Sequence, residues 1–150
     1  MNVQQLIDAI EALDATDALP CKLPLDDWKQ IAPYLSMRFL QPGDTLIRAG
    51  ETERVLFILT EGELHVRLGN TVLAALKPGT VVGEGAFFSG ATRSADVVAA
   101  LPGMAWALSW ERYEKLSRRL PRLALVLTQA FAAVLAVRMR EAILVDHFAG

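Results

Sequence analysis

The stretch VGEGAFFSGATRSA, residues 82–95, is the most informative part of this 150-residue chain. Glu84 follows a glycine, and Arg93 lies nine positions further on, before a serine and an alanine. At neutral pH a carboxylate only accepts hydrogen bonds and a guanidinium only donates them, so the pair suits a ligand with a hydroxyl and a phosphate. The glycines let backbone N–H groups approach an anion closely. The stretch predicts a clamp for a phosphorylated sugar, although a solvated Glu and Arg on a turn remain the alternative.

Short alternating segments surround this stretch, from about Met37 to Leu108. Pro-Gly pairs stand at residues 42–43, 78–79 and 102–103. Between them, segments such as 55–59 and 64–68 combine period-two patterning with nearby turn residues. This arrangement is typical of a small antiparallel barrel or jelly roll. We expect each strand to bury one face in a common core.

The two ends of the chain have helical periodicity instead. Apolar residues recur at three- and four-residue steps from Val3 to Leu13, which predicts an amphipathic helix. A Pro-bounded linker and a second helix over 25–32 follow, with acidic residues near its positive end. Another short helix is expected from Trp110, and Pro121 suits the first position of a long helix.

The long helix carries apolar side chains on more than one face. One stripe steps by four and three residues, as a coiled-coil seam does. Its members are Leu123, Leu127, Ala130, Val134, Val137, Glu141, Leu144 and Phe148. A second apolar face holds Leu125, Ala132, Leu135 and Ala136. Because such a helix must be covered on two sides, we expect the barrel on one side and a second copy of the chain on the other, forming a homodimer.

Composition excludes several classes of function. The net charge is −2 and no long basic run occurs, which argues against a nucleic-acid partner. The apolar run 123–137 is shorter than the ~20 residues of a membrane span, so we expect no membrane partner. The N-terminus lacks the features of a secretory signal, and we therefore expect a cytoplasmic protein. The single cysteine, Cys21, is expected to be half-buried and unreactive. A metalloenzyme with a small barrel of the cupin kind would need clustered histidines to hold its metal, but the predicted barrel contains only His65. We therefore expect that the protein is not an enzyme and holds no metal or other cofactor.

The central stretch resembles the phosphate-binding cassette of cyclic nucleotide-binding domains, which pair a Gly-Glu with a later Arg and small residues. Residues 41–51 resemble that family's first β-roll turn, 57–66 its central hairpin, and 76–79 the turn leading into the cassette. The resemblance runs from about Leu25 to Val145. It implies a mixed α+β, mainly β fold: an antiparallel β-roll or jelly roll flanked by N-terminal helices and a long C-terminal helix. We expect a single domain, 1–150, with N-terminal helices in 1–36, the roll in 37–109 and C-terminal helices in 110–150.

The resemblance also assigns roles at the cassette. Arg93 is expected to pair with the exocyclic oxygens of a cyclic phosphate, and Glu84 to accept from the ribose 2′-hydroxyl. Backbone N–H groups of Gly83, Gly85 and Ala86 would face the ligand, and the Ser94 hydroxyl would serve phosphate or base. Arg138 falls where relatives place base-contacting lid residues. It would stack on a purine, or else serve as a solvated or subunit-bridging charge.

The chain departs from the family pattern at two positions. Gly85 stands where Leu or Ile packs the cassette on the barrel, and Asp96 adds a negative charge near Arg93. The leading interpretation is a sensor of cyclic AMP or cyclic GMP. The two departures leave open a degenerate, nucleotide-free dimerisation scaffold as an alternative, and a cyclic di-GMP receptor is a further one. Transcription factors of this family, such as catabolite activators, carry a helix-turn-helix after the long helix. This sequence ends at Gly150 without one, so we expect a standalone module resembling the regulatory subunits of protein kinases, with its output through an unidentified protein partner.

Overall fold

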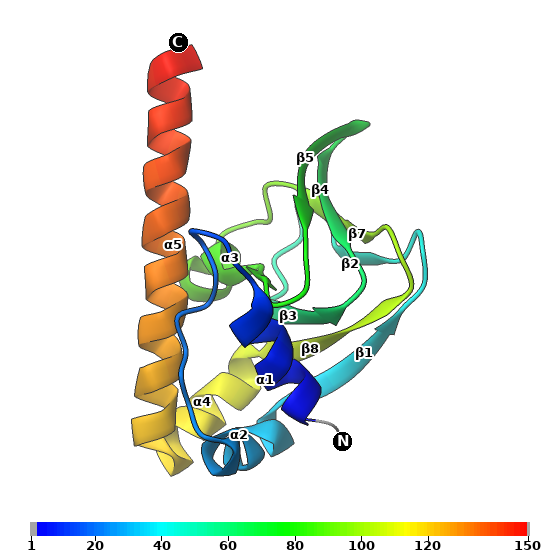
Figure 1. Ribbon diagram of the computed structural model, residues 1–150. Helices are drawn as coiled ribbons and strands as arrows, with labels where there is room; N and C mark the ends of the chain where they lie inside the picture. The colour runs from blue at the N-terminus through cyan, green and yellow to red at the C-terminus, as the bar shows by residue number, and fades with distance from the viewer. Residues whose placement is uncertain (1–2, 150) are drawn as a thin grey trace.

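The computed structural model describes residues 3–149, with side chains through Ile143. An antiparallel β-roll is flanked by helices on one side, and a long C-terminal helix extends past it (Figure 1). The described strands are β1 (Ser36–Leu40), β2 (Thr45–Ile47), β3 (Val55–Glu61), β4 (Leu64–Leu68), β5 (Thr71–Leu76), β6 (Val81–Val82), β7 (Asp96–Ala99) and β8 (Gly103–Ser109). The helices are α1 (Val3–Ala12), α2 (Leu25–Ile31), the 3₁₀ turn η1 (Ala32–Tyr34), α3 (Glu84–Ser89), α4 (Trp110–Arg119) and α5 (Pro121–Ala149). The flanked β-roll expected from the sequence is confirmed.

The strands form two four-stranded sheets, in the orders β1-β8-β3-β6 and β2-β7-β4-β5. All the pairings are antiparallel. The strand β6 ends at Val82, directly before α3, so the first sheet leads straight into the cassette. The loop after α3 then enters β7 of the second sheet. Both ends of the cassette are thus anchored, one in each sheet.

The expectation that each strand buries only one face is wrong for β3 and β8. Leu56 and Ile58 of β3 join an apolar cluster with the helices, whereas Phe57 and Leu59 join the cluster between the two sheets. The adjacent strand β8 divides in the same way, with Trp106 on the helix side. Because the helices cover the outer face of this sheet, its central strands are buried on both sides, which explains their nearly continuous apolar sequence.

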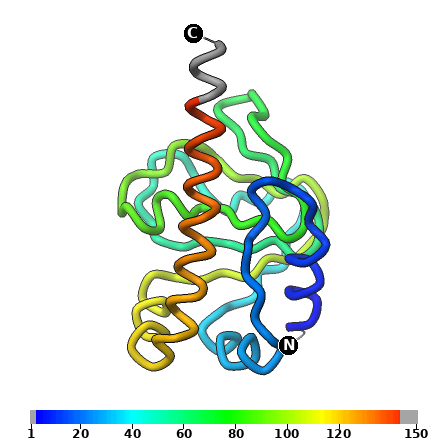
Figure 2. The backbone as a smooth tube through the Cα atoms, turned by 60° about the vertical axis from the view of Figure 1, so that its left-hand side comes forward, coloured from blue at the N-terminus to red at the C-terminus, as the bar shows by residue number. Residues whose placement is uncertain are grey.

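The N-terminal segment lies against this covered face. α1 packs on β3, and α2 packs on α1. Between them, the linker of residues 13–24 runs alongside α5 (Figure 2). The linker residue Cys21 is 5% exposed, so the expectation of a half-buried thiol is wrong, and burial raises the pKa of this thiol to about 11. The linker is therefore a packed part of the domain.

α5 uses the predicted seam to pack on its own domain. Leu123, Leu127, Ala130 and Val134 are all buried in the cluster between helices and sheet. The later members Leu144 and Phe148 have side chains outside the described residues. Of the predicted second face, Leu125, Ala132 and Ala136 are exposed, whereas Leu135 is half-buried. Met139 and Ile143, which were not predicted as part of it, are 64% and 61% exposed beside Leu125 at 58%. A stripe with seam spacing thus belongs to the core here, and the surface left for a partner is the other face.

α5 also has the composition of a membrane helix. Within Pro121–Ile143, an 18-residue window has a mean hydropathy of 1.6, and a third of that window is buried. No other helix in the described residues combines such length and apolar character. The core helix of a water-soluble domain has the same composition, and the buried residues of α5 pack on the roll.

Candidate functional site

Arg93 lies on the loop between α3 and β7, with only 7% of its surface exposed. Its guanidinium donates from Nη1 to the carbonyl oxygen of Gly83 at 2.7 Å. From Nη2 it donates to the carbonyl oxygens of Glu53, at 2.8 Å, and of Val55. Burial lowers the pKa of Arg93, while the charges of Glu53 and Glu84 act in the opposite direction. Because an arginine stays protonated in proteins, the site holds a fixed positive charge below its surface.

Gly83 makes room for this guanidinium. Its φ is +88°, a left-handed conformation that favours glycine. A Cβ at this position would lie 2.9 Å from Nη1 of Arg93 and 3.0 Å from the carbonyl oxygen of Val55. Any larger residue would therefore displace the arginine or the strand. The glycine of the Gly-Glu pair is required here by both conformation and space.

Glu84, the first residue of α3, is buried to a similar degree, with 7% exposed. Its Oε1 accepts a hydrogen bond from Nη1 of Arg138 at 2.7 Å. Its Oε2 is buried and has no hydrogen-bond partner among the described residues. A buried carboxylate oxygen without a donor is unfavourable by itself, so a donor group that reached this atom would stabilise it.

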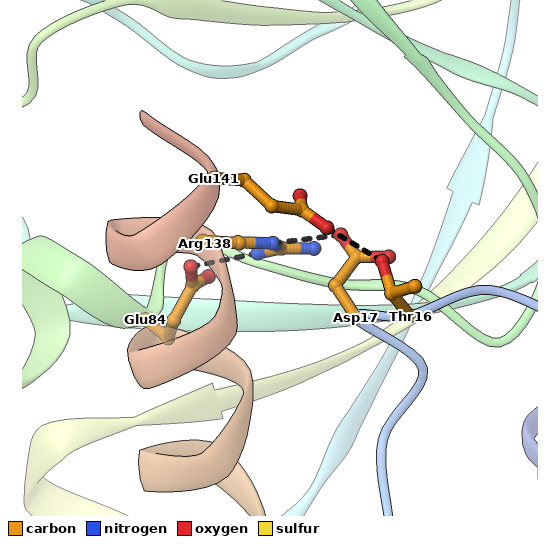
Figure 3. Close-up of polar contacts among 5 residues, drawn as sticks. All are labelled: Thr16, Asp17, Glu84, Arg138 and Glu141. Atoms are coloured by element: carbon orange, nitrogen blue, oxygen red, sulfur yellow. Dashed lines mark hydrogen bonds and ion pairs between the residues drawn. The ribbon is translucent and has the colours of Figure 1, made fainter. Parts of the chain in front are cut away.

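Arg138 connects three parts of the chain (Figure 3). Beside its contact with Glu84, it donates from Nε to Oδ2 of Asp17 at 3.0 Å. Burial acts to lower the pKa of Arg138, but the charges and hydrogen bonds of Glu84 and Asp17 outweigh it and raise that pKa. Its Nη2 is buried and without a hydrogen-bond partner in the described part of the chain. Arg138 is therefore held between two carboxylates, with 23% of its side chain exposed.

A cavity of about 440 Å³ lies between the cassette, the roll and α5. All seven residues predicted as ligand contacts line it: Gly83, Glu84, Gly85, Ala86, Arg93, Ser94 and Arg138. Its apolar wall comes from the strands: Ile47, Val66, Ala74, Leu76, Val82 and Val97. Asp17 and Glu141 lie at the same cavity. The volume suits one small organic ligand, and the wall combines an apolar surface with a few charged groups, as ligand sites do.

The model of the family "Cyclic nucleotide-binding domain" matches residues 37–119, more than half of the chain. The chain belongs to this family. The matched region contains the whole roll from Met37 and the cassette, and it ends with α4. The resemblance inferred from residues 82–95 is confirmed.

Two curated relatives match this chain over a small part of their own length. Glutaminase 2 of Bradyrhizobium diazoefficiens is 35% identical over 123 residues, which are 81% of this chain and 20% of that protein. Human cGMP-dependent protein kinase 2 is 35% identical over 91 residues, 61% of this chain and 12% of the kinase. The chain thus spans a fifth or less of the length of these relatives.

A solved structure shows the same fold over nearly the whole chain. The crystal structure of a cyclic nucleotide-binding domain from Methylobacillus flagellatus matches with a TM-score of 0.80 and 20% sequence identity. The match covers 97% of this chain and 81% of that one, so it includes the flanking helices as well as the roll.

The two departures from the family pattern have different structural outcomes. A Cβ on Gly85 would meet only Leu135 of α5, at 4.0 Å, so a larger side chain has space there. Asp96 accepts a hydrogen bond from the backbone N–H of Ala49 at 2.7 Å. It is therefore engaged with the neighbouring loop, and it is not among the charges that shift the pKa of Arg93.

Sequence reasoning missed the residues that hold this domain's cassette from outside. Arg54 donates to the carbonyl oxygens of Phe87 and Phe88, at 2.8 and 3.1 Å, at the end of α3. Its guanidinium also lies 3.6 Å from the ring centroid of Trp110, a cation–π contact with α4. Asp17 was missed as well. Neither residue belongs to a local motif, because each acts on a partner more than thirty positions away.

Proposed function

We propose that the chain is a non-enzymatic regulatory module that binds a cyclic mononucleotide in the cavity beside the cassette. The observation that supports this is that Glu84 and Arg93, both buried, line one cavity while each is held by other partners. A carboxylate and a guanidinium that are kept apart can recognise a hydroxyl and a phosphate on one ligand. Their position at a junction of cassette, roll and α5 fits a ligand that changes how these parts pack.

Arg93 supplies the phosphate contact in this proposal. Three of the five N–H donors of its guanidinium are used by the backbone carbonyls of Gly83, Glu53 and Val55. The remaining two donors are available for the exocyclic phosphate oxygens. Backbone N–H groups of Gly83, Gly85 and Ala86 complete the anion site, and the Ser94 hydroxyl serves phosphate or base.

Glu84 supplies the ribose contact. Its unpaired Oε2 accepts from the 2′-hydroxyl, and the unpaired Nη2 of Arg138 donates to the oxygen of the same group. A hydroxyl is suited to this pair because it donates and accepts through one atom. In this role Arg138 closes the cavity over the ribose, and its stacking on the purine is not needed.

The base remains either adenine or guanine. A cavity of about 440 Å³ favours a single nucleotide over cyclic di-GMP, because that volume is near the lower end of the range for ligand pockets. Human cGMP-dependent protein kinase 2, by its name, responds to cyclic GMP, and cyclic GMP is therefore one of the two nucleotides to test first.

The binding test is calorimetric titration of protein that has been freed of co-purified nucleotide. We expect saturable heat with cyclic AMP or cyclic GMP and none with 5′-AMP or 5′-GMP. Replacing Glu84 by Gln should weaken binding roughly 10- to 100-fold, the effect of losing one hydrogen bond to a charged acceptor. Glu51→Gln is the control, since the Glu51 side chain is 51% exposed and forms a weak ion pair with Arg48, at 3.9 Å. The absence of heat with every cyclic nucleotide would contradict the proposal.

The alternative is a nucleotide-free scaffold with the same fold. It is favoured by the fact that Arg93 and Arg138 have hydrogen-bond partners within the chain. A scaffold would show no heat with any nucleotide, and its association with partners would not change when Glu84 is replaced by Gln. The titration therefore separates the two functions directly.

For the output we propose a homodimer through α5, acting in the cytoplasm on a protein partner. The exposed face of α5 has its own four- and three-residue spacing. It consists of Leu125, Gln129, Ala132, Ala136, Met139 and Ile143. This is the spacing of a two-stranded coiled coil, so a second copy of the same helix is a fitting cover.

A charge on this face should disrupt the dimer. We expect Leu125→Glu to sediment as a monomer at micromolar concentration where the wild type sediments as a dimer. Leu73→Glu is a closely matched control, because Leu73 is 57% exposed on β5 and Leu125 is 58% exposed. A wild-type monomer with and without cyclic nucleotide would contradict the dimer.

A further inference from the structure

The linker between α1 and α2 contacts the helix that closes the cavity. Thr16 donates from its hydroxyl to Oε1 of Glu141 at 2.6 Å, and Asp17 accepts from Nε of Arg138 at 3.0 Å. Two consecutive linker residues therefore meet two residues one turn apart on α5 (Figure 3). These partners are separated by more than 120 positions in the sequence.

The contact with Asp17 is the outer half of a three-membered ion network. Arg138 is held at Nε by Asp17 and at Nη1 by Glu84, so its guanidinium is fixed between two carboxylates. The side chains of Arg138 and Asp17 are 23% and 26% exposed, and that of Glu84 is 9% exposed. Charge pairs at this depth are less screened by solvent than surface pairs, so each contact restrains the guanidinium.

The network leaves one buried donor and one buried acceptor unused. The donor is Nη2 of Arg138, and the acceptor is Oε2 of Glu84. Both residues line the cavity with Asp17. The direction in which Nη2 points depends on how the guanidinium is oriented, and Nε, the atom held by Asp17, shares that rigid plane.

We propose that Asp17 is a positioning residue of the ligand site: it orients Arg138 so that Nη2 of Arg138 and Oε2 of Glu84 bind one ligand hydroxyl together. The linker is thereby coupled to occupancy of the cavity. This inference rests on the proposed function, because the hydroxyl is the 2′-hydroxyl of the cyclic nucleotide. It adds that discrimination of ribose from deoxyribose depends on a linker residue outside the cassette.

The test compares a cyclic nucleotide with its 2′-deoxy analogue, using cyclic AMP and cyclic GMP and their 2′-deoxy forms. We expect Asp17→Asn to weaken binding of the ribonucleotide about tenfold, the loss expected for one charge-assisted hydrogen bond, and to change the affinity of the deoxy analogue less than about twofold. Asp17→Glu should retain more of the discrimination. Asp14→Asn is the control, because Asp14 is an exposed linker carboxylate and the change of charge is the same.

The outcomes separate the two proposals. If the wild type binds neither form of either nucleotide, the proposed function and the role of Asp17 both fail. If the wild type prefers the ribonucleotide and Asp17→Asn keeps that preference in full, only the role of Asp17 fails. Equal weakening toward both forms would also overturn it, since a purely structural defect acts on both.

A second measurement needs no variant. Hydrogen exchange of the wild type should show that amides of residues 15–19 gain protection when the ribonucleotide binds and not when the deoxy analogue binds at equal saturation. Unchanged exchange in the linker with a saturating ribonucleotide would overturn the coupling. This arm remains informative if the Asp17 variants fold poorly.

Discussion

Replacing Arg93 by Ala should destabilise the ligand-free protein, in addition to abolishing the proposed phosphate contact. The guanidinium donates to three backbone carbonyls, those of Gly83, Glu53 and Val55, and it is 7% exposed. Its loss would leave these carbonyls without their charged donor. Each hydrogen bond from a charged donor contributes about 1.5–3 kcal/mol, but the site borders a cavity where water can replace part of the loss.

We therefore expect a net loss of about 3–5 kcal/mol in the free energy of unfolding. At roughly 2–4 °C per kcal/mol for a domain of this size, the midpoint of thermal unfolding should fall by about 6–20 °C. The assay is thermal unfolding followed by circular dichroism on nucleotide-free protein. Arg93→Lys should fall between the wild type and Arg93→Ala, because one ammonium keeps the charge without the planar geometry.

Arg48→Ala is the matched control for this experiment. It removes the same charge, but Arg48 has a side chain that is 65% exposed and one ion pair, at 3.9 Å, with Glu51. Such a pair contributes about 0–1 kcal/mol, so this variant should unfold close to the wild type. If Arg93→Ala unfolds within about 2 °C of Arg48→Ala, the carbonyl contacts do not stabilise the fold and the reasoning is refuted.

Two further predictions concern Gly83 and Cys21. Gly83→Ala should weaken nucleotide binding, measured by calorimetry, and should lower the free energy of unfolding in urea more than Gly43→Ala does. Gly43 has a similar φ of +92° but open space around it, while a Cβ on Gly83 meets Arg93 at 2.9 Å. Equal effects of the two substitutions would show that only the backbone angle matters. Burial raises the pKa of Cys21 from 9.0 to about 11, so the folded state holds the thiol proton more tightly than the unfolded state does. The contribution of this group to the free energy of unfolding should therefore be fully present below pH 9. It should be lost, by on the order of 3 kcal/mol, as the pH rises through 11. Urea unfolding at pH 8 and 10.5 should show this extra fall in the wild type and not in Cys21→Ala, and identical pH dependence would contradict the assignment.

The cassette could be predicted from the sequence because its determinants are close together in the chain. Gly83, Glu84 and Arg93 lie within eleven positions, and the positive φ of Gly83 is a local consequence of that segment. The burial of Glu84 and Arg93 is not local, because Arg138 of α5 and the carbonyls of Glu53 and Val55 hold them. The alternation of the strands, by contrast, was local. What it did not show is that β3 and β8 are covered on both faces, since that depends on where the helices pack.

The faces of α5 could not be assigned from the sequence for a related reason. Both the buried stripe and the exposed stripe have steps of four and three residues, and both are largely apolar. Periodicity identifies a helix with two apolar faces, but it does not indicate which face meets the roll. The buried face carries Phe131, a residue that the predicted seam omitted and that contacts Phe88 at the end of α3, with ring centroids 6.2 Å apart.

The position of Arg138 joins the ligand site, the linker and the proposed dimer face on one helix. Arg138 faces the cavity, and the next residue, Met139, is 64% exposed on the outer stripe. A rotation or shift of α5 that moves Arg138 relative to Glu84 must therefore also move Met139 relative to whatever covers that stripe. A ligand can drive such a shift only through its difference in affinity for the two arrangements. The unused Nη2 of Arg138 and Oε2 of Glu84 provide that difference, because both atoms are buried without a partner where α5 now lies, and a shifted α5 would let a ligand hydroxyl reach and satisfy them.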